Sequence, residues 1–424
     1  MKTLSIVKAA LGGGAAILLG GLLAAAPAQA STGRTVPCKT QALIAAINVA
    51  NSSGGAQINL APRCTYHLTT ASSPNAVLGD TGLPAITSRI TLNGFHTTIA
   101  GNNSSFRIFL VTAPGNLTLN RLTITGGNVA APGGGIFNVE GTLTLNHSTV
   151  TGNASGGMMA AGGGIASGTF GTGPIGTTTL NFSQVNGNTT SGSAGGILNH
   201  GGTLILNFSQ VNGNTAAGGG GGIATGTGGM GGPGASKLVL NFSQVNGNTA
   251  NGGPMAGAGG IANGGTAAIK GSVVASNTAP GAAGGGILNH GVMTITLSKV
   301  TGNTAPADSA GDQGIGGGIA NINLGPVAPG AVNGGILAIT TSQIRGNTAS
   351  GQGGGIFEAT ITLNGPAPGG PLTLTLSQVT GNTAGQGGGI FAVPGSPITL
   401  KLTLIARNTP DNCAPPGTVT GCKN

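Results

Sequence analysis

The ten residues LNFSQVNGNT occur three times without change, at 180–189, 206–215 and 240–249. Such a repeat constrains the fold because each copy needs an equivalent environment, which a stack of similar units provides and one globular core does not. The shortest interval between copies is 26 residues, from Asn188 to Asn214, and longer intervals contain Gly-rich insertions. The repeated Asn recurs as a column: Asn128, Asn153, Asn188, Asn214, Asn248, Asn277, Asn303, Asn347, Asn382 and Asn408.

Within each repeat, apolar residues alternate with polar ones. Segments such as LTLN at 117–120 and LILN at 204–207 place Leu on one face, which is typical of a β-strand. A second segment carries an inward Val, as at Val185, and a third begins with Gly-Gly-Ile, as at Ile197. Three short strands in about 26 residues form one coil of a parallel β-helix. The sequence therefore predicts an all-β fold, a right-handed parallel β-helix solenoid of about twelve coils.

Stacking explains why the repeats are identical. Successive coils hydrogen-bond at a spacing of about 4.8 Å, so equivalent side chains lie over one another. We expect Phe182, Phe208 and Phe242 to form a ladder of rings, with His147 in the same position of an earlier coil. We expect the Asn column to occupy a bend in the left-handed conformation, with amides bonded from coil to coil. That role is structural rather than ligand-binding.

The first residues are typical of a secretory signal peptide. Lys2 and Lys8 precede an apolar run, and Ala28-Gln29-Ala30 has the small-residue pattern that a signal peptidase cleaves. We predict a signal peptide at 1–30 and a mature chain from Ser31; a membrane anchor is the competing interpretation. Because no later segment is apolar enough to span a bilayer, we expect an extracellular or cell-surface protein with no integral membrane segment after cleavage.

A helix is expected to cap the solenoid. Leu43, Ile44, Ile47 and Ala50 fall at helical spacing, so a short amphipathic helix from about residue 40 to 51 can cover the first coil. Residues 58–111 are consistent with irregular early coils. The predicted regions are an N-terminal cap with these coils at 31–111, the repeat β-helix at 112–410 and a disulfide tail at 411–424.

If the chain is exported, its four cysteines are expected to form disulfides. Cys38 and Cys64 flank the first mature segment, and Cys413 and Cys422 lie near the C-terminus. Of the three possible pairings, the local one, Cys38 with Cys64 and Cys413 with Cys422, is favoured. Zinc binding needs tighter Cys and His spacing than this chain has.

The repeats resemble those of a known family. GGGIF at 387–391 alternates with VTGNTA at 379–384, and this pattern is similar to the GGAI and FxxN repeats of chlamydial polymorphic outer membrane proteins. It also resembles the wider set of secreted bacterial right-handed β-helix proteins. The resemblance implies the architecture and a bacterial cell-surface location. Val or Ile stands in place of the Phe of FxxN, and no C-terminal barrel region follows.

Catalytic residue types are scarce. Glycosidic hydrolysis needs two nearby carboxylates, and only Asp308 and Asp312 share a loop, at 305–315. These two residues are the candidate metal ligands or acid pair, and a solvated polar loop is the competing interpretation. Sugar platforms are few, since the chain has one Tyr and no Trp. The six acidic residues of the chain are Asp80, Glu140, Asp308, Asp312, Glu358 and Asp411.

Other candidate sites are equally sparse. His200 and His290 occupy the same repeat position, ILNHG, but three coils apart they are too distant to share a metal or a proton. Gly218–Gly222 lacks the Lys-Ser/Thr of a phosphate loop, so no cofactor is predicted. An outward threonine column resembles ice-binding solenoids but is interrupted at Ile205. Arginines concentrate toward the N-terminal third without stacking aromatics, which does not indicate nucleic-acid binding.

Two hypotheses about function follow. The first is a non-catalytic, exported, adhesin-like scaffold, a monomer that binds an extended partner such as a polysaccharide or an anionic cell-surface polymer. The alternative is a carbohydrate-active enzyme of the pectate-lyase-like or epimerase-like β-helix type. In such enzymes long loops beside one strand face build the substrate cleft. Insertions of this kind fall at 155–162, 166–177, 224–236, 250–258, 305–315, 320–335 and 357–371.

Overall fold

The structure is a computed structural model. It describes residues 30–31, 35–168, 176–226, 236–253, 257–323, 335–362 and 365–424. The predicted signal peptide lies outside the described residues except for Ala30. In the described part of the chain, no helix is long and apolar enough to cross a membrane.

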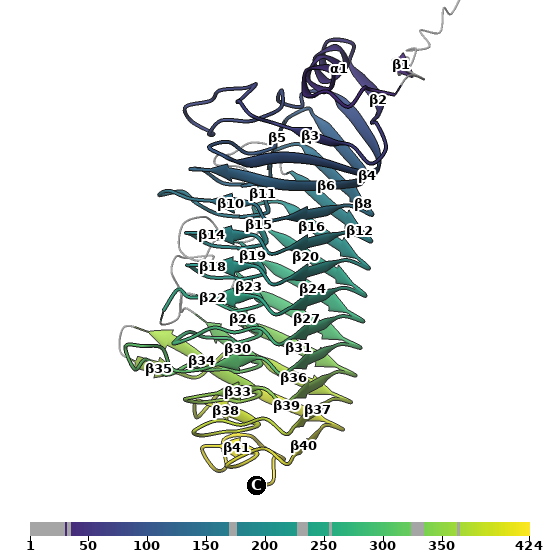
Figure 1. The fold of residues 1–424 in the computed structure, drawn as a ribbon. Coiled ribbons are helices and arrows are strands. Elements are labelled where there is room, and N and C mark those ends of the chain that lie inside the picture. The colour runs from purple at the N-terminus through teal and green to yellow at the C-terminus, as the bar shows by residue number, and fades with distance from the viewer. Residues whose placement is uncertain are drawn as a thin grey trace, which may run out of the picture.

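Three parallel sheets run the length of a rod (Figure 1). In the first sheet every strand pairs in parallel with the strand of the next coil, in register, so that Leu180 lies between Leu145 and Leu206. Twelve strands form this ladder within the described residues, which confirms the predicted parallel β-helix and its coil number. They are β2 (Gly55–Asn59), β4 (Arg89–Ser104), β6 (Asn116–Val129), β8 (Thr142–Asn146), β12 (Thr177–Asn181), β16 (Thr203–Asn207), β20 (Lys237–Asn241), β24 (Thr266–Lys270), β27 (Val292–Thr296), β31 (Ile336–Thr340), β36 (Leu372–Thr375) and β39 (Ile398–Lys401).

The second sheet follows the first after one turn and contributes the inward Val or Ile of each coil. Its strands are short because three residues suffice to present one inward side chain between two outward ones. They are β3 (Thr65–His67), the second halves of β4 and β6, β9 (Thr149–Thr151), β13 (Gln184–Asn186), β17 (Gln210–Asn212), β21 (Gln244–Asn246), β25 (Val273–Ala275), β28 (Lys299–Thr301), β32 (Gln343–Arg345), β37 (Gln378–Thr380) and β40 (Leu404–Ala406).

The third sheet carries the Gly-Gly-Ile repeats. Two glycines precede each strand from β7 to β38 because the coils approach closely there: a Cβ at Gly196 would lie 2.5 Å from the Gly222 carbonyl oxygen. The strands are β5 (Phe109–Thr112), β7 (Ile136–Val139), β11 (Ile165–Gly168), β15 (Ile197–His200), β19 (Ile223–Thr225), β23 (Ile261–Asn263), β26 (Ile287–Asn289), β30 (Ile319–Asn323), β34 (Ile356–Thr362), β38 (Ile390–Ala392) and β41 (Cys413–Ala414).

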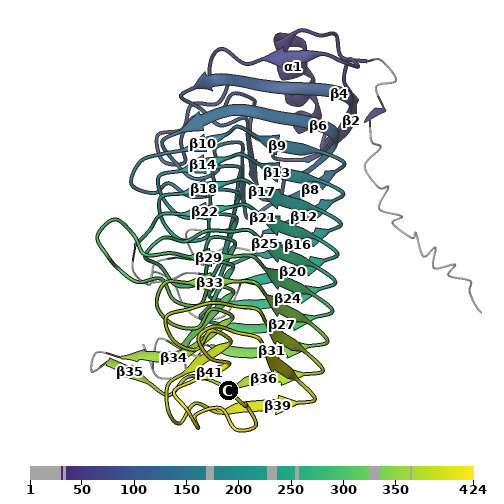
Figure 2. The ribbon, with the colours of Figure 1, turned by 60° about the horizontal axis from the view of Figure 1, so that its bottom comes forward.

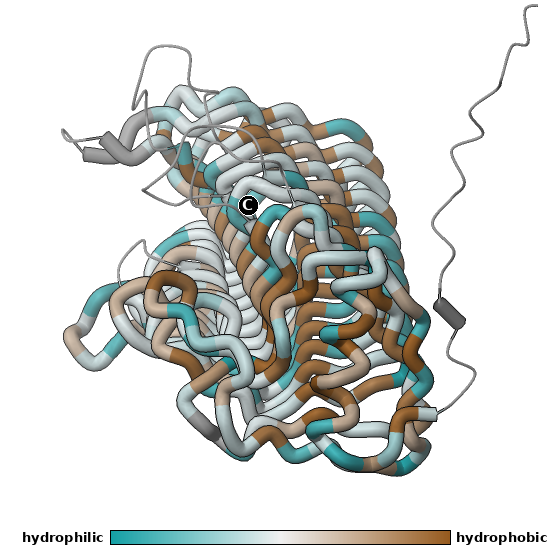
Figure 3. The backbone as a smooth tube through the Cα atoms, turned by 90° about the horizontal axis from the view of Figure 1, so that it is seen from above, coloured by the Kyte–Doolittle hydropathy of each residue, from teal (hydrophilic) through white to brown (hydrophobic). Residues whose placement is uncertain are grey.

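Short strands fill the corner between the second and third sheets, and one hairpin departs from the parallel pattern. β35 (Gly365–Ala367) pairs antiparallel with β34. The corner strands are β10 (Ala154–Ser155), β14 (Thr189–Thr190), β18 (Thr215–Ala216), β22 (Thr249–Ala250), β29 (Thr304–Ala305) and β33 (Thr348–Ala349). Seen along the rod, apolar residues of successive coils line up on the inside (Figure 3), where Leu, Val and Ile from the three sheets form one continuous core.

The N-terminal end is capped as predicted. β1 (Ala30–Ser31) pairs with β2, and α1 (Thr40–Ser52) lies across the first coil (Figure 1). The helix buries Leu43, Ile47 and Ala50 completely, which covers apolar side chains that the first coil would otherwise expose. The cap is tied down by the Cys38–Cys64 disulfide, and Cys413–Cys422 closes the other end, so the local pairing is confirmed.

The buried Asn column is confirmed from Asn153 to Asn408, with two corrections. Asn188 donates its backbone and side-chain N–H groups to Oδ1 of Asn214, at 2.9 and 3.0 Å, and later coils repeat the pattern. Asn128 is not in the column, because its register partner is Ala154 rather than Asn153. Gly127 occupies the column position in that coil, and its backbone N–H donates to Oδ1 of Asn153. The left-handed residue is not Asn but the residue before it, such as Gly187 (φ 61°). A side chain in the left-handed region is costly, so Gly takes the bend and leaves Asn free to bond.

Candidate binding face

The turn from the first sheet to the second places one residue of every coil in the left-handed region, with φ between 49° and 59°. We call this column the corner ridge. Its side chains point away from the core, and most of them are exposed. The corner ridge consists of Arg63, His96, Arg121, His147, Phe182, Phe208, Phe242, Gly271, Leu297, Thr341, Leu376 and Leu402.

A second left-handed column, five residues further along each coil, is built differently. It consists mostly of glycine: Gly126, Gly152, Gly187, Gly213, Gly247, Gly302, Gly346 and Gly381, with Ser276 and Arg407 as exceptions. A non-glycine residue in this conformation costs about 1 kcal/mol or more relative to Gly. At Gly271 the chain makes the same left-handed turn with a glycine in the ridge position. The backbone therefore does not require bulky side chains on the ridge, and eleven of the twelve coils carry them nonetheless.

The rings on the ridge stack on one another, as the sequence predicts. Ring centroids are 5.1 Å apart for His147 and Phe182, 5.0 Å for Phe182 and Phe208, and 5.3 Å for Phe208 and Phe242, with planes within 9° of parallel. The last ring packs over Gly271, where a Cβ would lie 2.6 Å from it. Because their faces are covered, the half-exposed rings turn their edges to solvent. They form a narrow apolar strip rather than separate stacking platforms.

Columns of amide side chains border the ridge on both sides. On the first sheet, Nδ2 of each Asn donates to Oδ1 of the Asn one coil back, from Asn241 to Asn59, at 2.7 to 3.0 Å. On the second sheet, Asn186 donates to Gln184 at 2.9 Å, and the next two coils repeat this pair. The repeated decapeptide thus places an apolar strip between two polar columns at the spacing of the coils. The strands that carry the columns, β12, β16 and β20 of the first sheet and β13, β17 and β21 of the second, follow one another coil by coil along the rod (Figure 2).

None of the six acidic residues lies on this face. Asp308 and Asp312 are in a loop before β30, where Oδ1 of Asp308 accepts the backbone N–H groups of Ala310 and Asp312, both at 2.9 Å. The Asp308 carboxylate therefore holds its own loop. Among the described residues, no group of three or more His, Cys, Asp or Glu side chains is arranged to hold a metal ion. Metal binding at Asp308 and Asp312 stays a prediction.

Glu358 is the one acidic side chain inside the rod. It is fully buried on β34, where Asn321 donates to its Oε2 at 2.8 Å and Oε1 has no hydrogen-bond partner of good geometry. Burial raises the pKa of Glu358 to about 9; the hydrogen bond from Asn321 and the nearby backbone N–H of Gly370 lower it only in part. The carboxyl is therefore neutral at pH 7 and cannot serve as a base or a partner of Asp308.

A buried polar column leads to Glu358, and sequence analysis did not identify it. Asn263 donates to Asn289 and Asn289 to Asn321, each at 2.7 Å. The sequence signal is the polar residue two positions after the first Ile of each third-sheet strand, as in Ile319–Asn321. It was missed because an alternating strand pattern assigns that position to the core, where a polar residue needs a partner from another coil.

The histidines stay apart, as expected. His200 on β15 and His290 after β26 are separated by three coils, since β19 and β23 lie between these strands. Nδ1 of His290 lies 2.9 Å from the carbonyl oxygen of Ile322, and burial lowers the pKa of His290. The His290 ring thus contacts the following coil, at β30.

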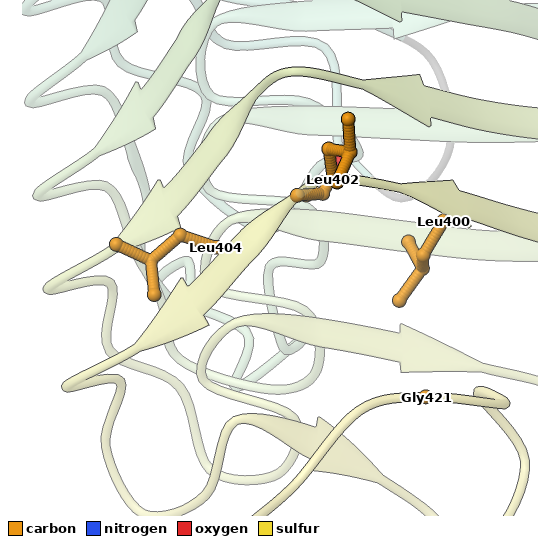
Figure 4. Close-up of a pocket in the computed structure, with 5 residues that line it drawn as sticks. Leu400, Leu402, Leu404 and Gly421 are labelled. Atoms are coloured by element: carbon orange, nitrogen blue, oxygen red, sulfur yellow. The ribbon is translucent and has the colours of Figure 1, made fainter.

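The last coil exposes side chains that are buried elsewhere in the rod. Leu400, Leu402, Thr403, Leu404 and Gly421 line a shallow depression at the C-terminal end (Figure 4). Leu400 is only partly buried, whereas its register partner Leu374, one coil earlier, is fully buried. The difference arises because no described strand stacks on β39 and β40 from the far side.

Comparison with known proteins shows no family for this chain. No protein-family model matches the sequence, and no curated protein matches it. Among solved structures, the A-module of the mannuronan C-5 epimerase AlgE6 of Azotobacter vinelandii is similar, with a TM-score of 0.47 and 14% identity. The match covers 89% of this chain and 95% of that chain. The insertions at 166–177, 224–236 and 320–335, expected to border a cleft, lie largely outside the described residues.

Proposed function

We propose that this protein is an exported, non-catalytic, adhesin-like scaffold that binds an extended polysaccharide or anionic cell-surface polymer along the corner ridge. The observation that carries the proposal is the contrast between the two left-handed columns. Gly occupies most of one column, while side chains occupy eleven of the twelve ridge positions at a conformational cost that ring stacking offsets only in part. Side chains kept on the surface under these conditions indicate a binding role.

The partner is proposed to be a polymer because the face repeats. The ridge offers the same apolar strip and the same amides once per coil, and the length of one sugar ring in an extended glycan is close to this spacing. Pyranose rings have C–H groups that can pack against ring edges and Leu side chains, and hydroxyls that can bond to Gln and Asn. Many weak contacts of this kind add up along a polymer.

Export is part of the proposal. Two disulfides within the described chain favour an oxidising compartment. The signal-peptide pattern at 1–30 and the resemblance of the repeats to those of chlamydial polymorphic outer membrane proteins favour a surface or secreted location. We further propose that the protein is a monomer and needs no cofactor.

A glycan-array screen of the chain from Ser31, with calcium and with chelator, tests the proposal. The key variant replaces Phe182, Phe208 and Phe242 with Gly, which the left-handed conformation accepts. The matched control replaces exposed apolar Met158 and Met159, which lie in a loop away from the ridge, with Gly. We expect the ridge variant to lose polymer binding and the control to keep it. Equal binding by all three proteins would refute a role for the ridge.

The competing function is a carbohydrate-active enzyme that uses the loop at 305–315. Each array hit is therefore incubated with the protein and examined for cleaved or epimerised product. Turnover that is lost in Asp308→Asn with Asp312→Asn would replace the scaffold proposal with the enzymatic one.

A further inference from the structure

Exposed cations of the repeat region gather on one face. Along the stretch from Arg89 to Lys401, every exposed Lys or Arg occupies an outward position of the first or second sheet or of the corner ridge. The arginines concentrate toward the N-terminal third of the sequence, and the structure adds that the exposed Lys and Arg of this stretch are grouped by face. They are Arg89, Arg121, Lys237, Lys270, Lys299, Arg345 and Lys401.

Four of these cations form a line across successive coils, which we call the basic diagonal. Lys237 begins β20 and Lys270 ends β24, both on the first sheet; Lys299 begins β28 and Arg345 ends β32, on the second sheet. β24 follows β20 in the first ladder, and β28 precedes β32 in the second. From each cation to the next, the line thus advances by one coil along the rod and passes from the first sheet toward the second. From the strand rise and the coil spacing, neighbouring Cα positions are about 8 to 14 Å apart.

The diagonal crosses the corner ridge between Lys270 and Lys299. Gly271 follows Lys270 directly, and the Phe242 ring that packs over this Gly gives the crossing an apolar floor. Lys270 stands in the column that Asn fills in seven earlier coils, so it ends the amide ladder there. Lys299 stands in the register position of Val273 and Gln343. Neighbouring coils show that neither position needs a cation to fold.

No carboxylate is available on this face to pair with the four cations. All six acidic residues of the chain are described, and none occupies an outward position of the first or second sheet. Neighbouring cations are separated by about one Debye length at physiological salt, so their repulsion is modest and their attraction for a polyanion adds up. The charge is therefore directed outward, to a partner.

We infer that the basic diagonal selects an anionic polysaccharide, one with carboxylate, sulfate or phosphate groups along its chain, and holds it across the ridge at Gly271. This inference rests on the proposed polymer-binding function and names the class of polymer. The cations meet the acidic groups of the polymer, while Phe242 and Leu297 contact the sugar rings between them.

The test compares binding of polygalacturonate with binding of its fully methyl-esterified form, at low and at physiological ionic strength. The variant is Lys270→Asn with Lys299→Gln, which installs residues that neighbouring coils already carry at these positions and so preserves the fold. The control removes the same charge elsewhere, as Lys39→Gln with Lys423→Gln. We expect the wild type to prefer the acidic polymer, and the variant to lose about tenfold in affinity at low salt and much of the salt dependence. The control should bind as the wild type does.

Other outcomes separate the two proposals. Equal affinity for the ester and the acid, or equal losses in variant and control, would overturn the anionic selectivity and leave the polymer-binding function standing. If the protein binds neither these polymers nor any glycan of the array, the proposed function itself fails. Binding to vesicles that contain phosphatidylglycerol, or to single-stranded DNA, without binding to any polysaccharide would overturn both proposals and assign the face to a different partner.

Discussion

The buried Glu358 makes a sharp prediction about stability. In the folded chain its pKa is about 9, whereas the ordinary value is 4.5. Between these two pH values the folded protein keeps a proton that the unfolded chain has released, so the free energy of unfolding falls as the pH rises. Each pH unit changes this free energy by about 1.4 kcal/mol. The loss is about 3 kcal/mol from pH 4.5 to pH 7 and about 6 kcal/mol over the whole window.

Glu358→Gln removes this dependence while keeping the shape of the neutral acid. The amide oxygen can accept the hydrogen bond from Asn321, and the amide nitrogen takes the place of Oε1, next to Gly369. We expect the variant to match the wild type near pH 4.5 and to exceed it by about 3 kcal/mol at pH 7. Other groups, including His290, titrate alike in both proteins, so the difference between the two isolates Glu358.

Urea denaturation followed by far-UV circular dichroism, repeated from pH 4 to pH 8.5, measures the difference. Glu140→Gln, a change of the same kind at a partly exposed position, serves as the control. Infrared spectroscopy provides a direct check, because the band of a protonated carboxyl at neutral pH should disappear in Glu358→Gln. A stability difference that stays constant across the pH range, with no such band, would show that the carboxyl is ionised and that the reasoning from burial is wrong.

Three further changes test the packing of the solenoid by urea denaturation. Asn248→Ala leaves the backbone N–H of Asn214 without its buried acceptor and removes a further ladder bond, so a loss of about 3 to 5 kcal/mol is expected; a loss below about 1 kcal/mol would contradict the ladder. Phe208→Gly should be more stable than Phe208→Ala by about 1 kcal/mol, the reverse of the usual order in a strand, because the ridge is left-handed. Replacing Cys38 and Cys64 with Ser should cost about 3.5 kcal/mol, from the entropy of the 26-residue loop, and unchanged stability would show that the cap is held by packing alone.

Much of the fold could be predicted because each coil of a solenoid is determined by a short, continuous segment of sequence. Alternating Leu residues, the inward Val and the Gly-Gly-Ile segment determine the three strands of a coil, and exact repetition determines the register, since a slip of one residue would turn Leu180 outward. The ring ladder from His147 to Phe242 followed from the same argument. The pairing of cysteines was also accessible, because each pair is close in sequence and lies at one end of the rod.

The site depended on information that local patterns do not contain. The sequence shows Phe182 and Gly187 as two ordinary residues. Only the backbone reveals that both are left-handed, and that side chains are common in one left-handed column and rare in the other. Cations far apart in the sequence, such as Lys299 and Arg345, become neighbours because each coil brings the chain back to the same face. The buried state of Glu358 depends on its register with Asn321, which is 37 residues away.

The sequence by itself determined the unit of this protein: the strands, the period, the cap and the residues that stack. The tertiary structure decided which residues share a surface and which are withdrawn from water. The physical reason is that hydrogen bonding between coils acts at one short, constant spacing, which repetition alone can specify. The electrostatic environment and the burial of a side chain depend instead on the residues of the neighbouring coils. The lengths of the insertions between coils determine which residues those are.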